Sequence, residues 1–260
     1  MTFKSILRGV TLGAILVVMT ACQTTLSGGP DTRAQKTPLD VVQQTLFESA
    51  REAELANNYE QAAAVYGRLF ERRYNDPAVL AAFIRNMRYS GRSREITSYV
   101  EDKTQHLLGD ATVKFEFAKA LLSAGRKDES LQVLSKVATL MPNNWQVYSA
   151  TGVTLDALER YQQASQAYAR ALQVSPNNPV VLNNLAMSLA MSGKLAEATK
   201  TLERAAGIDR QHPHIRQNLA LLYAIDGKIE RARALAAMDL DLGELETNLS
   251  FYRRFEKGPK

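Results

Sequence analysis

Hydrophobic and polar positions recur along the chain with a period of 34 residues, from residue 43 to residue 246, without insertion or deletion. Small residues dominate the eighth and twentieth positions of each period, and large apolar residues return at the seventh and twenty-fourth. Small side chains at one point on each of two helices let antiparallel helices approach closely, while larger ones fill the space around them. A fixed period of this length predicts a row of stacked helical hairpins. The predicted repeats are 43–76, 77–110, 111–144, 145–178, 179–212 and 213–246.

The second repeat departs from this pattern of small residues. Ile84 and Ile96 stand at its eighth and twentieth positions, where the other repeats carry smaller side chains. Because both residues would face each other across the hairpin, we expect its two helices to lie further apart than those of the fourth repeat.

The residues expected at helix ends keep the same period. Asp76, Asp110, Asn144 and Asn178 close successive repeats and are strong N-caps, and a proline follows two of them at the first helical position. Residues that tolerate a left-handed backbone occupy the fifteenth position, except for Glu159 in the fourth repeat. We therefore expect helices of about 14 residues. Residues 38–246 would form the repeats, and residues 247–260 the cap and tail, with a capping helix over 244–255 that buries Leu245, Leu249 and Tyr252.

The repeats resemble the tetratricopeptide repeat, which has small residues at positions 8 and 20, an aromatic at 24, alanine at 27 and proline at 32. The fourth repeat carries the most of these residues, namely Gly152, Ala164, Tyr168, Ala171 and Pro176. The resemblance implies an all-α fold, a right-handed α-solenoid of six helix-turn-helix repeats with a C-terminal capping helix.

The N-terminal segment has the layout of a secretory signal: a basic start, an apolar stretch from Gly9 to Val18 and a small-residue end. The apolar stretch is too short for a permanent membrane span, which needs roughly 20 residues. Thr20, Ala21 and Cys22 resemble the end of a bacterial lipoprotein signal. We therefore expect residues 1–21 to be removed, Cys22 to be acylated, and residues 22–37 to form a polar tether at the periplasmic face of the outer membrane. The alternative is a buried free thiol at Cys22.

Charge and candidate chemistry exclude several classes of protein. Without residues 1–21 the chain has 30 basic and 27 acidic residues, and no basic stripe of the kind that binds nucleic acid. With one cysteine it forms no internal disulfide. His212, Pro213 and His214 could be half of a metal site, but an N-cap turn between repeats explains them better. No catalytic motif is present, so we expect no enzyme activity, cofactor, metal or small-molecule substrate.

Binding of a protein segment is the function that a solenoid favours, since the first helices of its repeats line an extended surface. By the tetratricopeptide resemblance this groove is basic and aromatic in its N-terminal half, and apolar with amides in its C-terminal half. Such a groove suits an extended or amphipathic segment with an acidic end. The alternative is that neighbouring helices or the cap cover these side chains. The predicted groove residues are Arg51, Arg85, Arg88, Tyr89, Phe115, Lys119, Asn183, Met187, Gln217 and Leu221, with Phe47, Val153, Val180, Met191 and Ile225 in the same columns.

The last third of the chain resembles the TadD family, lipoproteins of tight-adherence (Flp) pilus assembly. The resemblance is carried by the run from Ile215 to Tyr223, by Gly227 and Lys228, by Asp239 and Leu240, and by the tail ELETNLSFYRRF. It implies a non-enzymatic, pilotin-like role at the inner face of the outer membrane, in which the protein helps a pilus secretin to assemble or localise. The alternative is a periplasmic adaptor lipoprotein that recruits cell-wall hydrolases or envelope assembly factors through the same fold.

Overall fold

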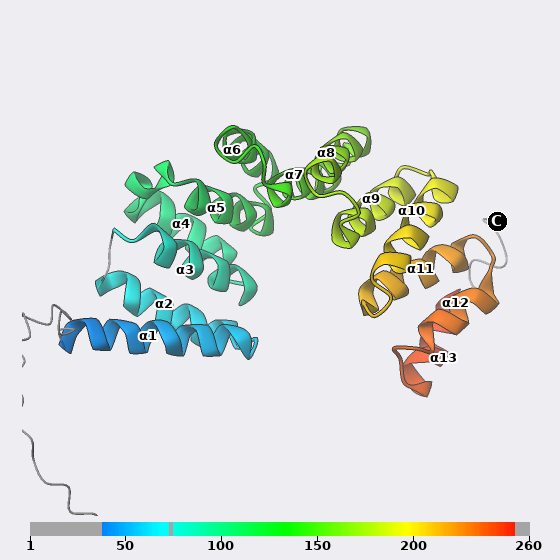
Figure 1. Cartoon of the computed structure of the whole chain (residues 1–260), viewed down its shortest axis with the longest axis horizontal. Coiled ribbons are helices and arrows are strands. Elements are labelled where there is room, and N and C mark those ends of the chain that lie inside the picture. Colours follow the sequence, from blue (N-terminus) through cyan, green and yellow to red (C-terminus); the bar gives the residue numbers. More distant parts are fainter. Residues whose placement is uncertain (1–37, 73–74, 253–260) are drawn as a thin grey trace, which may run out of the picture. The chain divides into compact units, whose positions relative to one another are not determined.

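A computed structural model of the chain describes residues 38–72 and 75–252, and every regular element in these residues is a helix (Figure 1). The chain divides into two units, Met1–Thr37 and Pro38–Lys260, and all of these helices belong to the second. The predicted signal peptide 1–21, Cys22, the tether 22–37 and tail residues 253–260 lie outside the described residues. The elements are α1 (Pro38–Leu55), α2 (Tyr59–Arg72), α3 (Pro77–Tyr89), α4 (Ser93–Lys103), the short 3₁₀ helix η1 (Gln105–Gly109), α5 (Ala111–Ser123), α6 (Lys127–Leu140), α7 (Trp145–Ala157), α8 (Tyr161–Val174), α9 (Pro179–Met191), α10 (Leu195–Ile208), α11 (Pro213–Ile225), α12 (Ile229–Ala236) and α13 (Leu242–Tyr252).

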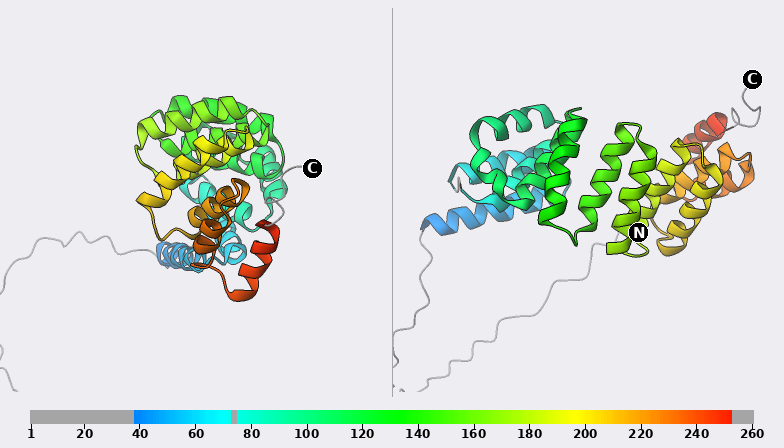
Figure 2. Two further views of the ribbon diagram at one scale, coloured as in Figure 1. Left: turned by 90° about the vertical axis from the view of Figure 1, so that its right-hand side faces the viewer. Right: turned by 90° about the horizontal axis from the view of Figure 1, so that it is seen from above.

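Helices α1 to α12 pair into consecutive hairpins, and the second helix of each hairpin packs on the first helix of the next (Figures 1 and 2). Contacts therefore run from neighbour to neighbour along the chain, as the 34-residue period predicts. The expected all-α solenoid of helix-turn-helix repeats is confirmed.

Helix boundaries follow the period closely, except in α1, α4 and α12. The first helix of each repeat from the second to the sixth begins at the residue that opens the repeat, and α1 begins earlier, at Pro38. The expectation of about 14 residues per helix is wrong for α4, which has 11 residues and continues into η1, and for α12, which has 8. The C-terminal helix α13 stands where the cap was expected.

Capping chemistry begins the first helices of the repeats as expected at most turns. The side chains of Asp76, Asp110, Asn144 and Asn178 each accept backbone N–H bonds of the helix that follows, whereas His212 caps α11 without such a bond. Glu159 adopts a left-handed backbone with φ 59°, although it is not a glycine. The turn geometry is therefore shared by all the repeats. The residues at this fifteenth position, all with positive φ, are Asn57, Gly91, Gly125, Glu159, Gly193 and Gly227.

Each residue at positions 8 and 20 of the repeats is buried. The closest approach involves Gly152, because a Cβ atom there would lie 2.5 Å from the ring of Tyr168. In the second repeat, Ile84 and Ile96 are both buried, and the two helices of this hairpin, α3 and α4, pack on each other less extensively than those of any other hairpin in the described chain. Helix α3 packs more extensively on α5 than on its own partner α4, which is short. The wider separation of α3 and α4 stays a prediction.

The core is a series of clusters along the stack. The largest spans α1 to α5, and smaller ones link each later hairpin to the next. Leu245 joins the last cluster from α13, as predicted, while the side chains of Leu249 and Tyr252 are outside what the structure describes. None of the described helices is both long enough and apolar enough to cross a membrane.

Candidate partner-binding surface

The predicted groove residues lie on the first helices of the hairpins, and several of the basic ones already have acidic partners. On α3, Arg85 donates from Nε to Glu54 Oε1 at 2.7 Å, and Glu54 also accepts from Asn86 and from the hydroxyl of Tyr66, both at 3.3 Å. Burial raises the pKa of Glu54, but the hydrogen bond and charge of Arg85, together with the hydrogen bonds from Asn86 and Tyr66, outweigh it, so the carboxyl pKa lies below its usual value. Only Arg51, among the predicted arginines of this half, is exposed.

A second charge cluster lies between α3 and α5. Lys119 Nζ is 2.6 Å from Glu116 Oε1, and Arg88 Nη2 is 3.9 Å from Glu116 Oε2. The Glu116 side chain is 8% exposed, and its Oε2 has no hydrogen-bond partner among the described residues. These ion pairs leave the N-terminal half of the surface less basic than its arginines and lysine suggest.

Aromatic side chains in this half are engaged by the same cations. The guanidinium of Arg88 lies 4.1 Å from the ring centre of Tyr89, and Lys119 Nζ lies 4.6 Å from that of Phe115. Tyr89 is half exposed, whereas Phe115 is 9% exposed and belongs to a core cluster with Ala118. Phe115 therefore offers little surface to a partner.

The predicted groove residues of the C-terminal half are amides and apolar side chains, and none of them is charged. Asn183 Oδ1 on α9 accepts from Asn218 Nδ2 on α11 at 2.8 Å, so an amide pair bridges two neighbouring repeats. Met187, Gln217 and Leu221 are half buried. The exposed apolar side chains of this region are Val153, Val180, Met191 and Ile225.

A group of hydrogen-bonded polar side chains between repeats 4 and 5, Asp156, Tyr168 and Ser188, was not anticipated from the sequence. We call such a group of an acid, a tyrosine and a polar residue of the next repeat a polar bracket. Asp156 accepts from the hydroxyl of Tyr168 at 2.7 Å and from that of Ser188 at 2.6 Å. Burial, together with the Asp156 carboxylate, raises the pKa of the Tyr168 hydroxyl far above its usual value. Asp156 and Tyr168 occupy positions 12 and 24 of the repeat, as Glu54 and Tyr66 do in the first repeat. An acid and a tyrosine at this spacing were therefore the sequence signal that could have predicted the bracket.

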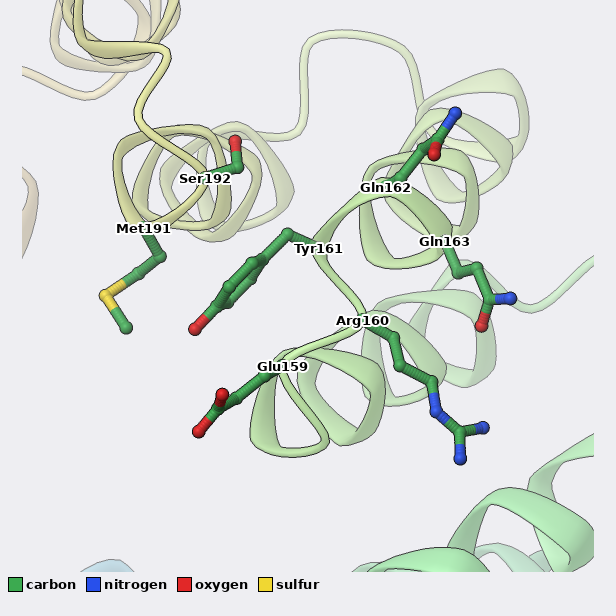
Figure 3. A pocket seen from close by; sticks show the side chains of 7 residues that line it. All are labelled: Glu159, Arg160, Tyr161, Gln162, Gln163, Met191 and Ser192. Carbon is green, nitrogen blue, oxygen red and sulfur yellow. The ribbon is translucent and has the colours of Figure 1, made fainter.

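A shallow depression opens at the turn edge of repeats 4 and 5. Its volume is about 600 Å³, and Figure 3 shows the side chains of Glu159, Tyr161 and Met191 extending into one space. Arg160 and Gln163 also line the depression, although in this view they point away from those three side chains. The lining residues are Glu159, Arg160, Tyr161, Gln162, Gln163, Met191 and Ser192.

Residues 38–72 and 75–252 contain no cluster of three or more His, Cys, Asp or Glu side chains that could hold a metal ion. The rings of His212 and His214 have centres 5.8 Å apart, and Nδ1 of His212 is buried without a hydrogen-bond partner in this part of the chain. His212 is the N-cap residue of α11 and His214 lies in the first turn of that helix, so the pair stands where the sixth repeat begins.

Comparison with known proteins bears on the fold. Tetratricopeptide repeat families match residues 115–179 and residues 157–222. No curated protein matches the chain. Three similar solved structures are each matched over most of their own length. Their sequence identities to this chain are low, so the similarity shows the fold alone. They are TTC0263, a thermophilic TPR protein of Thermus thermophilus (17% identity, TM-score 0.54, 81% of this chain and 98% of that one), MamA 41-end from Desulfovibrio magneticus RS-1 (16%, 0.51, 69% and 96%) and MamA MSR-1 C2 (22%, 0.50, 66% and 99%).

The matched residues, 115–222, run from α5 to α11 and include both the amide pair and the depression. Tetratricopeptide repeats bind other proteins through such surfaces. By its fold, the described part of this chain is an all-α solenoid of helix-turn-helix repeats, and residues 115–222 match the tetratricopeptide repeat, which implies a scaffold for protein–protein interaction.

Proposed function

We propose that the chain is a lipid-anchored scaffold on the periplasmic face of the outer membrane, where it binds components of a tight-adherence pilus and assists its secretin. The anchor would be Cys22, at the end of a segment with lipoprotein-signal layout. The repeats would supply the binding surface.

The observation that carries the proposal is the resemblance of the last third of the chain to the TadD family. In the structure this stretch is one packed unit: Arg216 on α11 forms an ion pair with Asp239, and Leu245 of α13 packs on the last hairpin. The two side chains of the ion pair are 12% and 7% exposed. The Arg216 guanidinium holds the pKa of Asp239 below its usual range. The residues of the resemblance therefore fix the end of the solenoid, which supports a shared architecture.

The direct test is deletion of the gene, followed by immunoblots of the pilus secretin in outer-membrane fractions. We expect the heat-resistant secretin multimer to fall while total secretin monomer persists, and the wild-type gene to restore the multimer. An unchanged multimer would refute the secretin role. Recovery of cell-wall hydrolases without any secretin after cross-linking would favour the adaptor instead.

A second test concerns the anchor. Replacing Cys22 with serine should abolish metabolic labelling by a fatty acid and release the protein from the outer-membrane fraction. The repeats would still fold, since no described helix involves Cys22. Labelling that persists in Cys22→Ser would refute lipidation at this residue.

The groove is best probed at Arg51, because reversing the charge of Arg85 would also break its ion pair with Glu54. We expect Arg51→Glu to reduce secretin recovery in a cross-linked pull-down. Arg68→Glu on α2 is the matched control, since Arg68 is also exposed but lies on the second helix of its hairpin. Equal recovery with both variants would remove this part of the groove from the binding surface.

A further inference from the structure

Two junctions of the solenoid, three repeats apart, carry equivalent residues at their turn edge. Tyr59 and Tyr161 are the first residues of α2 and α8 and stand at the same repeat position. Tyr89 and Met191 are the last residues of α3 and α9 and also stand at one position. Each tyrosine therefore faces a large side chain from the following repeat, and the first junction can be compared directly with the second.

The first junction is filled from within the chain. The ring of Tyr89 lies 4.8 Å from that of Tyr59, with 33° between their planes, and the guanidinium of Arg88 lies over the Tyr89 ring at 4.1 Å. The Tyr59 hydroxyl donates to Asn57 Oδ1 at 2.6 Å. An aromatic side chain preceded by an arginine thus occupies the space beside the tyrosine.

The second junction has the same tyrosine but lacks the filling. Met191 replaces Tyr89 and is 65% exposed, and Ala190 replaces Arg88. The space that results is the depression of about 600 Å³ in Figure 3. Within the described residues, neither the hydroxyl of Tyr161 nor the carboxylate of Glu159 has a hydrogen-bond partner.

The depression is lined by one carboxylate, that of Glu159, and one guanidinium, that of Arg160. Glu159 extends toward the space of Tyr161 and Met191, whereas Arg160 points away from that space and already has an acidic partner, since its Nη2 lies 3.5 Å from Asp128 Oδ1. Glu159 also holds a left-handed backbone that glycine would adopt at lower cost. The chain therefore keeps a carboxylate beside the depression in spite of that conformational cost.

We propose that this depression binds an aromatic side chain flanked by an arginine or lysine on a partner protein, with the ring against Tyr161 and Met191 and the cation facing Glu159. Offset aromatic pairs and sulfur–aromatic contacts favour the ring, and the unpaired carboxylate favours the cation. The inference rests on the proposed scaffold function but not on the identity of the pilus partner. The two can fail separately, because the test uses a peptide.

The test is a titration of the chain from Pro38 onward, which forms one unit, with its methionine methyl groups labelled with carbon-13 for NMR. The probe is a capped synthetic peptide copied from residues 86–91 (NMRYSG), which contains the arginine and tyrosine of the filled junction. An incoming ring should shift the Met191 methyl signal upfield, with saturation at millimolar peptide. Met238 is also 65% exposed and should not move, so it reports non-specific binding.

Peptide and protein variants separate the two contributions. A peptide with leucine in place of tyrosine should give no upfield shift, and one with glutamine in place of arginine should bind about threefold more weakly. Tyr161→Leu should weaken binding roughly tenfold. Glu159→Gln should weaken binding of the arginine peptide only. Gln166→Ala, at an exposed position of α8 outside the lining, should change nothing.

The Met187 methyl signal, from the same helix as Met191, checks that each variant remains folded. An unmoved Met191 signal in the wild-type protein would overturn the proposal. An equal shift at Met238, or undiminished binding to Tyr161→Leu, would do the same. Equal affinity of the wild-type protein for the arginine and glutamine peptides, with both affinities unchanged in Glu159→Gln, would overturn the role of the cation.

Discussion

The polar brackets of the first and fourth repeats use side chains of different length for the same contact. In the first, Tyr66 donates to Glu54 at 3.3 Å, and the eighth position is Ala50. In the fourth, Tyr168 donates to the shorter Asp156 at 2.7 Å, and the eighth position is glycine. A Cβ atom at that glycine would lie 2.5 Å from the Tyr168 ring, so the ring occupies the space that alanine fills elsewhere. The size of the residue at position 8 and the length of the acid at position 12 are thus adjusted together.

Each bracket also reaches into the next repeat. Glu54 accepts from Asn86, and Asp156 accepts from Ser188, both at the tenth position of the following repeat. A buried polar group costs free energy unless it is hydrogen-bonded, so each bracket favours one register between neighbouring hairpins. The two repeats between them carry valine or leucine at position 24, where only apolar packing is available.

The largest effect is expected from Gly152→Ala, which places a methyl group against the Tyr168 ring. We expect a loss of about 3 kcal/mol in the free energy of unfolding, measured by urea denaturation, because overpacking forces side chains off their rotamers. Ala50→Gly in the first repeat is the control and should cost about 1 kcal/mol through helix propensity. Adding Tyr168→Leu, which recreates the alanine and leucine pair of the third and fifth repeats, should recover most of the loss. If it does not, the two positions are not coupled.

The next effect concerns the acid of the bracket. Asp156→Ala leaves the hydroxyls of Tyr168 and Ser188 buried without their acceptor, and should cost about 2 kcal/mol. Asp156→Asn keeps one acceptor oxygen and should cost less than half as much in the same denaturation experiment. Equal losses in the two variants would show that charge, rather than hydrogen bonding, holds the bracket.

A smaller and opposite effect is expected at the turn that follows. Glu159→Gly should stabilise the protein by about 1 kcal/mol, because glycine adopts a left-handed backbone without the steric cost of a Cβ atom. Asn57→Gly at the same position of the first repeat should change stability by only a few tenths of a kcal/mol, since asparagine tolerates that backbone. Thermal melts of the two variants side by side make the comparison. Destabilisation by Glu159→Gly would contradict it.

The smallest effect is the pH dependence of the first bracket. The pKa of Glu54 is lowered in the folded chain, so the unfolded chain takes up the proton first as the pH falls. The stability contributed by Glu54 is therefore complete above its usual pKa of 4.5 and is lost as the pH falls through the folded-state value. The stability difference between wild type and Glu54→Gln should narrow as denaturation is repeated from pH 6 to pH 3. A constant difference would show that Glu54 titrates normally.

The helical hairpins and most helix starts could be predicted from the sequence. The period, the helix caps and the small residues all depend on local structure and on packing between neighbouring helices. Even Glu159, which breaks the glycine pattern, adopts the backbone of its equivalents, since the hairpin imposes it. The short α12 was not predicted. It ends just before Asp239, which pairs with Arg216, and a contact between residues 23 positions apart is not visible in a local sequence pattern.

The binding surface was less predictable than the fold. The repeat columns placed Arg85 and Arg88 on the correct helix, but pairing with Glu54 and Glu116 depends on which acids the neighbouring helices present. Phe115 fits a groove column by position and is nevertheless covered in a core cluster. The depression could not be predicted from one position, because it depends on the space that Ala190 and Met191 leave beside Tyr161.

The division of the core into successive clusters has a consequence for how this chain would come apart. A cut in the turn between α6 and α7 leaves the whole of the first cluster, from Ala50 to Leu121, on one fragment. The last cluster, in contrast, is built mostly from alanines and one leucine of the cap. Because stability in such arrays is close to a sum of neighbour terms, amide hydrogen exchange should be fastest near α12 and α13 and slowest around α3. The molecule would then lose its order progressively from the C-terminal end, while the N-terminal half of the predicted groove remains folded.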